Sequence, residues 1–256
     1  MNIVVFDTET TTVDKPFCYN VGYIIYSTSK KQVLLKRDFV VEQVWHNTML
    51  FSSAYYAEKR PLYISRMRGG TAVMNKWGYI VRQMRNDFKA YDVKQAYAYN
   101  SSFDERVFNF NCDWYKTLNC FDTIPIYDIR KYFIHTLQTV ENELSFYESF
   151  CEDNFEFTES HNYSTTAETA YRYIVEDKDF NEEHTALADS EIELDILLWC
   201  LENGCELGSC YKVPKFLERT NTKTLKVIDR NGEVWAFDYN KKTVRTKGET
   251  ETHYLK

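Results

Sequence analysis

Three short runs rich in β-branched and aromatic residues open this chain, and they constrain its fold more than any other feature. They occupy residues 3–6, 21–26 and 33–41, and a polar turn at residues 27–31 joins the second to the third. Runs of this length and composition predict strands. Because helical patterns follow and a further short strand is predicted at residues 95–99, the sequence predicts an α/β fold with a mixed central sheet flanked by helices.

Helical periodicity dominates the later segments. Between residues 49 and 89, apolar residues recur at helical spacing and basic residues fall on another face, namely Trp77, Val81, Met84 and Phe88 against Arg82, Arg85 and Lys89. Residues 124–133 and 186–201 are also predicted helices, and Thr165 with Glu168 has the spacing of a capping box that opens a helix at 167–174. Residues 144–163 mix acids and aromatics without a period, which predicts an irregular segment.

The composition changes near residues 208–214, where we place a domain boundary. Residues 1–210 form the predicted α/β domain, with segments at 44–90 and 135–163 that are longer than a minimal domain needs. Residues 211–256 form a small β appendage, because strand patterns at 224–229 and 233–239 flank the turn Arg230-Asn231-Gly232. A third strand is predicted at 242–246.

Several classes of protein are excluded by composition. The longest strongly apolar run, residues 196–201, is too short to span a bilayer, and the first residues lack the pattern of an export signal. The 7 cysteines are scattered without metal-type pairing, which favours free thiols in a reducing compartment. The sequence therefore predicts a cytoplasmic protein without a membrane partner.

The net charge of −7 hides a strong segregation of charge along the chain. Residues 141–210 carry 19 acidic and 2 basic side chains, whereas residues 59–94 carry 9 basic and 2 acidic ones. The acidic block around residues 141–183 is most simply a solvated face, and exclusion of duplex substrate from the site is the alternative. The basic segment is a candidate surface for a polyanion, and a solvated basic face is the alternative.

Five side chains suited to metal binding and proton transfer stand at predicted strand ends and helix starts. Asp7 and Glu9 follow the first strand and project to the same side, and Asp104 follows the strand at 95–99. His184 precedes the helix at 186–201 and Asp189 lies in its first turn, where Ala186 and Ala188 allow close approach to the sheet. Each residue alone also fits an ordinary role, as a solvated strand end, a helix N-terminal acid or a surface histidine.

Together and in this order, these residues resemble the three motifs of the DEDDh exonucleases, a ribonuclease H-like family that includes proofreading subunits and oligoribonucleases. The matching segments are Asp7-Thr8-Glu9, Asn100-Ser101-Ser102-Phe103-Asp104, and His184 with Asp189 five positions on. The resemblance spans residues 1–205 and takes in Phe121-Asp122-Thr123. Two departures, Thr11-Thr12-Val13 after the first motif and Tyr99 before the second, concern substrate choice and leave the catalytic set complete.

The resemblance implies a ribonuclease H-like sheet and a 3′ to 5′ exonuclease that releases nucleoside 5′-monophosphates from an unpaired 3′ end of DNA or RNA. It implies that Asp7, Glu9, Asp104 and Asp189 bind two Mg²⁺ or Mn²⁺ ions, with Asp7 bridging them. His184 would take the proton from the attacking water. Four clustered carboxylates repel one another unless cations lie between them, which is consistent with this assignment.

Two other functions remain open from the sequence: a nuclease of short RNA or small oligonucleotides, and a nucleic-acid-binding module without turnover. Stand-alone proteins of this kind resemble those of bacteria and their phages. The choice between DNA and RNA and the oligomeric state, a dimer included, are also open.

Further residues are candidates for substrate binding. Those near the terminal nucleotide are Thr8, Thr10, Asn100 and Phe103, although Phe103 is also a natural packing residue. Those predicted to follow the phosphate backbone are Arg66 and Arg68, in a loop with Gly69-Gly70, and Arg82 and Arg85 on a helix behind it. The appendage, with Trp235, Phe237 and Lys241-Lys242, fits an extra nucleic-acid contact, a dimer surface or a stabilising flap.

Overall fold

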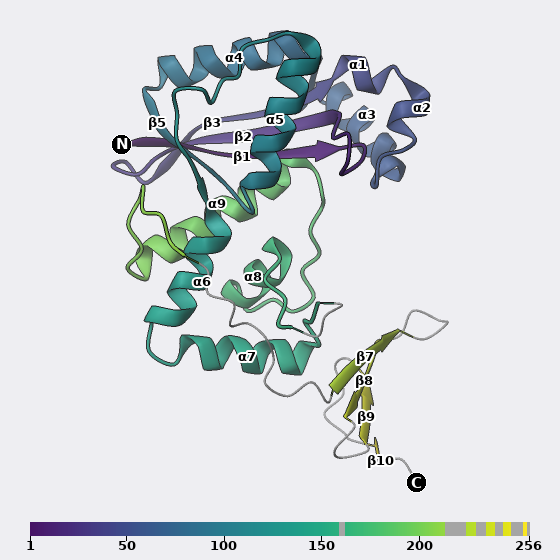
Figure 1. Cartoon of the computed structure of the whole chain (residues 1–256), viewed down its shortest axis with the longest axis vertical. Coiled ribbons are helices and arrows are strands. Elements are labelled where there is room, and N and C mark those ends of the chain that lie inside the picture. The colour runs from purple at the N-terminus through teal and green to yellow at the C-terminus, as the bar shows by residue number, and fades with distance from the viewer. Residues whose placement is uncertain (159–161, 213–223, 229–233, 239–242, 247–252, 255–256) are drawn as a thin grey trace.

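The computed structural model describes residues 1–158 and 162–212, together with the backbone of short strands between residues 224 and 254. Its first part is a mixed α/β unit built on a six-stranded sheet with the strand order β4-β3-β2-β1-β5-β6 (Figure 1). The strands are β1 (Asn2–Thr10), β2 (Cys18–Ser27), β3 (Gln32–Val41), β4 (Val73–Asn75), β5 (Val93–Ala98) and β6 (Ile126–Asp128).

Both antiparallel and parallel pairs occur in this sheet. Strand β2 pairs antiparallel with β1 on one side and with β3 on the other. Strand β5 pairs parallel with β1, β6 pairs parallel with β5, and β4 pairs parallel with β3. The three predicted N-terminal strands are therefore confirmed, and the carboxyl end of β1 lies at the same edge of the sheet as the carboxyl ends of β5 and β6.

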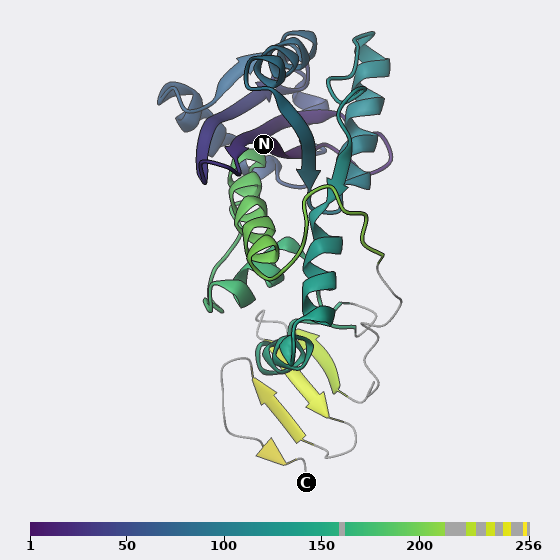
Figure 2. The same cartoon turned by 90° about the vertical axis from the view of Figure 1, so that its left-hand side faces the viewer.

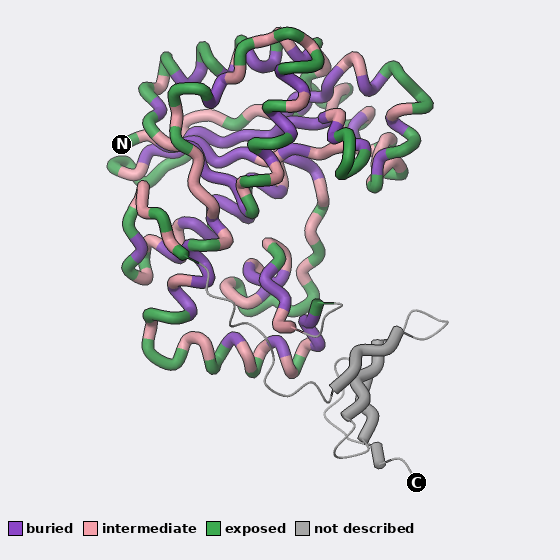
Figure 3. Tube along the Cα trace, viewed as in Figure 1, coloured by how far each residue is buried: buried purple, intermediate pink, exposed green. Residues whose placement is uncertain are grey.

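Helices cover both faces of the sheet, which explains why its central strands are so apolar. Along β1, Val4 and Phe6 pack into one buried cluster and Ile3 and Val5 into another. The first cluster contains residues of α4 (Trp77–Ala90) and α5 (Ser102–Tyr115). The second contains residues of α6 (Ile129–Thr139), α7 (Glu143–Asn154), α8 (Ala167–Ile174) and α9 (Ala186–Glu202). Figure 2 shows these layers from the side, and Figure 3 shows the buried residues along the central strands.

The segment 44–90 is more divided than its helical pattern predicts. It contains α4 as expected, but three short helical pieces and the edge strand β4 precede it. These pieces are α2 (Thr48–Phe51), the 3₁₀ helix η1 (Ala57–Lys59) and α3 (Arg60–Arg68). Helix α1 (Glu42–Trp45) lies before them and directly follows β3. A strand of three residues such as β4 carries too few positions for a period to be recognised.

Two further predictions need correction. Residues 144–163 are not irregular throughout, because α7 covers Glu143–Asn154 with Tyr147 and Cys151 buried one turn apart. Residues 124–133 begin with β6 rather than a helix, and α6 starts only after Asp128, whose carboxylate accepts a hydrogen bond from the backbone N–H of Arg130. Residues 126–128 form a strand because they pair parallel with β5. Such pairing is a tertiary effect that local sequence patterns do not contain.

The predicted C-terminal hairpin is present in the backbone. Strands β7 (Thr224–Ile228) and β8 (Val234–Asp238) pair antiparallel, and β9 (Thr243–Thr246) adds to β8 as the predicted third strand. A further short strand, β10 (His253–Tyr254), pairs with β9. The turn Arg230-Asn231-Gly232, Lys241-Lys242 and the side chains of Trp235 and Phe237 lie outside what the structure describes.

All seven cysteines are unpaired, as predicted, and all but Cys210 are buried. Within the part of the chain that the structure describes, every helix is too short or too polar to cross a bilayer.

Candidate active site

Strand β1 delivers side chains to both faces of the sheet at its carboxyl end. Asp7 and Glu9 project toward α9, and Thr8 projects toward α5. The register between β1 and β2 shifts between Glu9 and Thr10, and such irregularities commonly redirect side chains next to functional sites. The strand therefore places two carboxylates on one face and a hydroxyl between them on the other.

Helix α9 approaches the sheet over a glycine. Asn20 of β2 accepts a hydrogen bond from the backbone N–H of Ala186 (2.8 Å) and so caps the start of the helix. The backbone of Ala186 and Leu187 lies directly over Gly22, and the hydroxyl of Ser190 donates to the Gly22 carbonyl (3.3 Å). The predicted close approach is thus made by Ala186 on the helix and by Gly22 on the sheet, which the sequence analysis did not single out.

We expect Gly22→Ala to destabilise the protein strongly, because a Cβ there would lie 2.1 Å from the backbone carbonyl carbon of Ala186 and from the nitrogen of Leu187. Overpacking costs about 1–3 kcal/mol, and backbone atoms yield less than side chains, so we expect a loss of about 3 kcal/mol or more. Denaturant unfolding followed by circular dichroism measures this loss. The matched control is Gly69→Ala, whose new Cβ meets nothing closer than 3.4 Å. If Gly22→Ala unfolds at the denaturant concentration of the parent, the close packing of α9 on β2 is wrong.

Three carboxylates meet where α9 crosses the end of β1. One oxygen each of Asp7, Glu9 and Asp189 lies within 4.8 Å of the others. Burial is the main reason that the pKa of all three is raised. The charge of Asp7 raises the pKa of Glu9 and Asp189 further, and the charges of Asp104 and Glu182 do the same for Asp7. Asp189 also has a buried Oδ1 with no hydrogen-bond partner among the described residues. Protonation of these carboxylates, or binding of a cation between them, is therefore energetically favoured.

Asp104 joins this group from the opposite face of the sheet. It lies in the first turn of α5, is 1% exposed, and accepts a hydrogen bond from Thr8 Oγ1 (2.6 Å). Burial raises the pKa of Asp104 to about 7, against the lowering effect of the Thr8 hydroxyl. Its negative charge in turn contributes to the raised pKa of Asp7. The fourth predicted acid is therefore close enough to act on Asp7, although its oxygens are not part of the tight group.

His184 lies at the edge of this acidic cluster. Its Nδ1 is 3.4 Å from Glu182 Oε2, and one ligand atom each of Glu182, His184 and Asp189 lies within 4.8 Å of the others. The backbone φ of His184 is +51°, in the left-handed region that non-glycine residues seldom adopt. Burial lowers the pKa of His184, and the ammonium of Lys59 lowers it further. The imidazole is therefore neutral over a wider pH range than an exposed histidine.

The segment between β3 and β4 contributes two residues that sequence reasoning missed. Tyr56 stacks on the His184 ring with a centroid distance of 4.4 Å and an interplanar angle of 11°. Lys59 lies over the Tyr56 ring (4.6 Å) and donates a hydrogen bond to the Glu183 carbonyl. The only signal in the sequence was the extra length of residues 44–90, which gives no indication of where that segment folds.

Two acids beside the predicted set were also missed. Glu182 precedes His184 by two residues, and burial raises its pKa to about 7. Glu193 follows Asp189 by one helical turn, is 3% exposed, and has a buried Oε2 without a hydrogen-bond partner among the described residues. Burial and then the charges of Asp7 and Asp104 raise the pKa of Glu193. Its position i+4 from Asp189 was the available signal.

The acidic block is not simply a solvated face. Arg172 is buried and forms ion pairs with Glu156 and Glu168, both at 2.8 Å. The Arg172 guanidinium also donates to the Phe180 carbonyl (2.6 Å), and the Glu182 backbone N–H donates to Glu168 (3.1 Å). The block thus folds around one of its two basic residues and anchors the segment that leads to His184.

The predicted substrate-binding residues fall into different environments. Thr10 and Phe103 are half-buried, and Asn100, with φ at +56°, donates its backbone N–H to Asp128 (3.0 Å). Arg66 and Arg68 belong to the last turn of α3 rather than to a loop. Arg66 forms ion pairs with Glu183 and with Asp38 (3.1 Å), so it braces the segment before His184.

Arg82 and Arg85 lie elsewhere. They are exposed on α4, which leads into the amino end of β5. Because Asn2 pairs with Val93 at that end, Asp7 lies five residues further along β1, about 16 Å away along the sheet. The two arginines are therefore not next to the carboxylate cluster.

Comparison with protein-family models gave no match, and a search of curated proteins gave no significant match.

Proposed function

We propose that this chain is a metal-dependent 3′ to 5′ exonuclease of the DEDDh type, with a ribonuclease H-like fold, acting on an unpaired nucleic-acid end. The observation that carries the proposal is the convergence of Asp7, Glu9 and Asp189, with Asp104 and His184 beside them, at the carboxyl end of β1. Those are the residues that the motif resemblance selects. The mixed sheet flanked by helices is compatible with that fold.

The donor set fits hard divalent cations. Every member of the tight group is a carboxylate, and oxygen ligands are what Mg²⁺ and Mn²⁺ prefer. The unpartnered buried oxygens of Asp189 and Glu193 are the second observation in favour, since buried charged groups without a partner are costly. Asp7, Glu9, Asp104 and Asp189 would hold the ions.

When bound, two such cations supply charge neutralisation at the phosphodiester and lower the pKa of water. The chain's own residues do the rest. His184 accepts the proton of the attacking water through Nε2, while Glu182 near Nδ1 and the Tyr56 ring fix the imidazole plane. Thr8 holds the Asp104 carboxylate in one orientation.

A substrate panel tests the proposal directly. Single-stranded DNA, duplex DNA, RNA and dinucleotides, each labelled separately at the 5′ and 3′ end, are incubated with the full chain in Mg²⁺, Mn²⁺ or EDTA. We expect metal-dependent release of mononucleotides from the 3′ end of single strands. If the protein cleaves dinucleotides or short RNA faster than longer single strands, small oligonucleotides are its substrate class instead. Binding without cleavage in either metal would leave a nucleic-acid-binding module, and cleavage in EDTA would contradict the metal assignment.

A further inference from the structure

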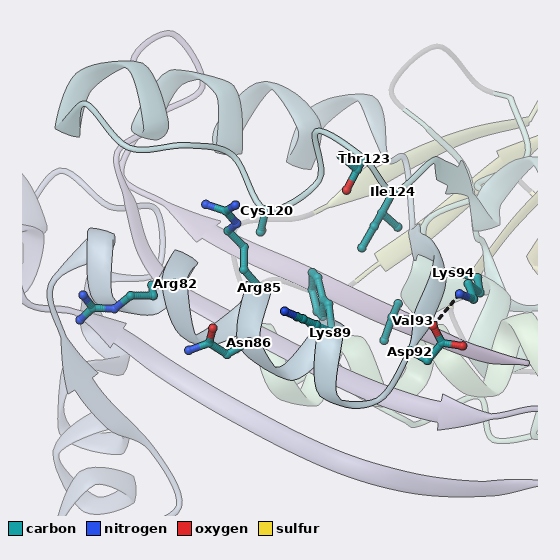
Figure 4. A pocket seen from close by; sticks show the side chains of 11 residues that line it. Arg82, Arg85, Asn86, Lys89, Asp92, Val93, Lys94, Cys120, Thr123 and Ile124 are labelled. Atoms are coloured by element: carbon teal, nitrogen blue, oxygen red, sulfur yellow. Dashed lines mark hydrogen bonds and ion pairs between the residues drawn. The ribbon is translucent and has the colours of Figure 1, made fainter.

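A basic cavity lies at the end of the sheet opposite the carboxylate cluster. It has a volume of about 620 Å³ and lies between α4, the start of β5 and the residues before β6 (Figure 4). Four exposed cationic side chains line it, against the single carboxylate of Asp92: Arg82, Arg85, Lys89 and Lys94. Phe88 and Ile124 add an apolar part to its lining.

Most of this positive charge is uncompensated. Lys94 is paired with Asp92 (2.5 Å), but no ion pair in the described part of the chain includes Arg82, Arg85 or Lys89. The one acid of α4, Asp87, is buried and contacts Tyr23 and Arg37 instead. Arg82, Arg85 and Lys89 therefore present positive charge that no carboxylate of the described residues neutralises.

The arrangement of these cations favours a polymer over a single phosphate. Arg82, Arg85 and Lys89 have i, i+3, i+7 spacing, so they form a row of about 10 Å along one face of α4. One phosphate cannot contact a row of that length, whereas a phosphodiester backbone carries a charge at every nucleotide. The Arg82 guanidinium lies over the ring of Tyr79 (5.6 Å), which is 42% exposed and gives a surface on which an unpaired base can stack.

We infer that this cavity is a second nucleic-acid site, which holds the backbone of a single strand away from the carboxylate cluster. It deepens the proposed exonuclease function and rests on it for the identity of the ligand. The site adds affinity through phosphate contacts that do not depend on base sequence, and it acts only on strands long enough to reach it. About 16 Å separate the two sites along β1, so very short oligonucleotides engage one or the other.

The test is a binding measurement in EDTA, where no metal-dependent hydrolysis takes place. Fluorescence anisotropy of the full chain is compared for oligothymidylates of about 20 and about three nucleotides, over a range of salt concentrations. We expect Arg85→Glu with Lys89→Glu to weaken binding of the long strand about tenfold or more and to reduce its salt slope by about 1.4, the value for two lost contacts. Lys30→Glu with Lys178→Glu makes the same change in net charge at exposed positions outside the cavity lining and should behave as the parent.

Each result separates this inference from the proposed function. Unchanged affinity of the Arg85→Glu, Lys89→Glu protein for the long strand overturns the second site, whatever the hydrolysis assay shows. Equal losses for the long strand, the short strand and inorganic phosphate used as a competitor also overturn it, because they indicate a pocket for a single phosphate. Loss confined to the long strand, in a chain that cleaves nothing in Mg²⁺ or Mn²⁺, supports the second site and removes the exonuclease.

Discussion

Asp7→Asn is expected to abolish metal-dependent hydrolysis and at the same time to stabilise the metal-free protein. Asp7 is the residue whose charge raises the pKa of Glu9, Asp189 and Glu193, so removing it relieves the strongest repulsion in the site. Loss of one ligand for the cations should lower turnover by about 1,000-fold or more, which corresponds to about 4 kcal/mol of transition-state stabilisation. Relief of a buried repulsion of about 1–2 kcal/mol should raise the melting temperature in EDTA by about 2–8 °C.

Melting curves with and without Mn²⁺, together with calorimetric titration, measure both effects. The parent should gain stability from Mn²⁺, because an ion that binds only the folded state shifts the unfolding equilibrium, and Asp7→Asn should lose most of that gain. Glu105→Gln is the matched control, since it removes an exposed acid from the same helix turn as Asp104. A metal-free Asp7→Asn protein that melts below the parent, with two-ion binding intact, would contradict the assignment.

His184→Asn is expected to lower turnover by about 100- to 10,000-fold, the usual range for a general base, while Mn²⁺ still binds. Asparagine is the sharpest substitution here because it tolerates the left-handed backbone conformation at φ +51° and removes only the imidazole. Because the pKa of His184 is lowered, the parent imidazole should be neutral, and competent as a base, throughout neutral pH.

The competing role for His184 is that of a metal ligand. Glu182, His184 and Asp189 also lie close enough to hold an ion, so a direct ligand role for the imidazole is a real competitor. If His184→Asn loses Mn²⁺ affinity and activity together, His184 is a ligand rather than the base. His135→Asn is the control, because that histidine stacks on Tyr211 and belongs to neither group of potential metal ligands. Its turnover should equal that of the parent.

Short-range patterns predicted the elements that are long and periodic. Strands β1 and β2 are buried along most of their length because the sheet is covered on both faces there, and β3 is buried in its second half. Helix α9 carries the apolar residues that pack against the sheet. The same reasoning failed for β4 and β6, which have only three residues each. Such strands exist because a neighbouring strand offers unpaired backbone groups, and that neighbour is distant in sequence.

The five predicted site residues, Asp7, Glu9, Asp104, His184 and Asp189, were selected because their order and spacing resemble the DEDDh motifs. Their shared location depends on packing. Gly22 admits α9 against β2, and Asn20 caps that helix, yet neither residue has a periodic or motif signal. Contacts between residues 20–22 and 186–190 join segments more than 160 residues apart in the sequence. A pattern within a short segment of sequence does not contain them.

The α/β class and the three opening strands follow from periodicity and composition, and the motif resemblance selects four acids and one histidine. Tertiary packing places Tyr56 on His184, adds Glu182 and Glu193 to the acids, and puts Arg82 and Arg85 on a cavity at the other end of the sheet. The reason is physical. Strand and helix periods record which side of one element is buried, whereas a ring stack, a shared electric field or a row of unpaired cations exists only between elements that folding brings together.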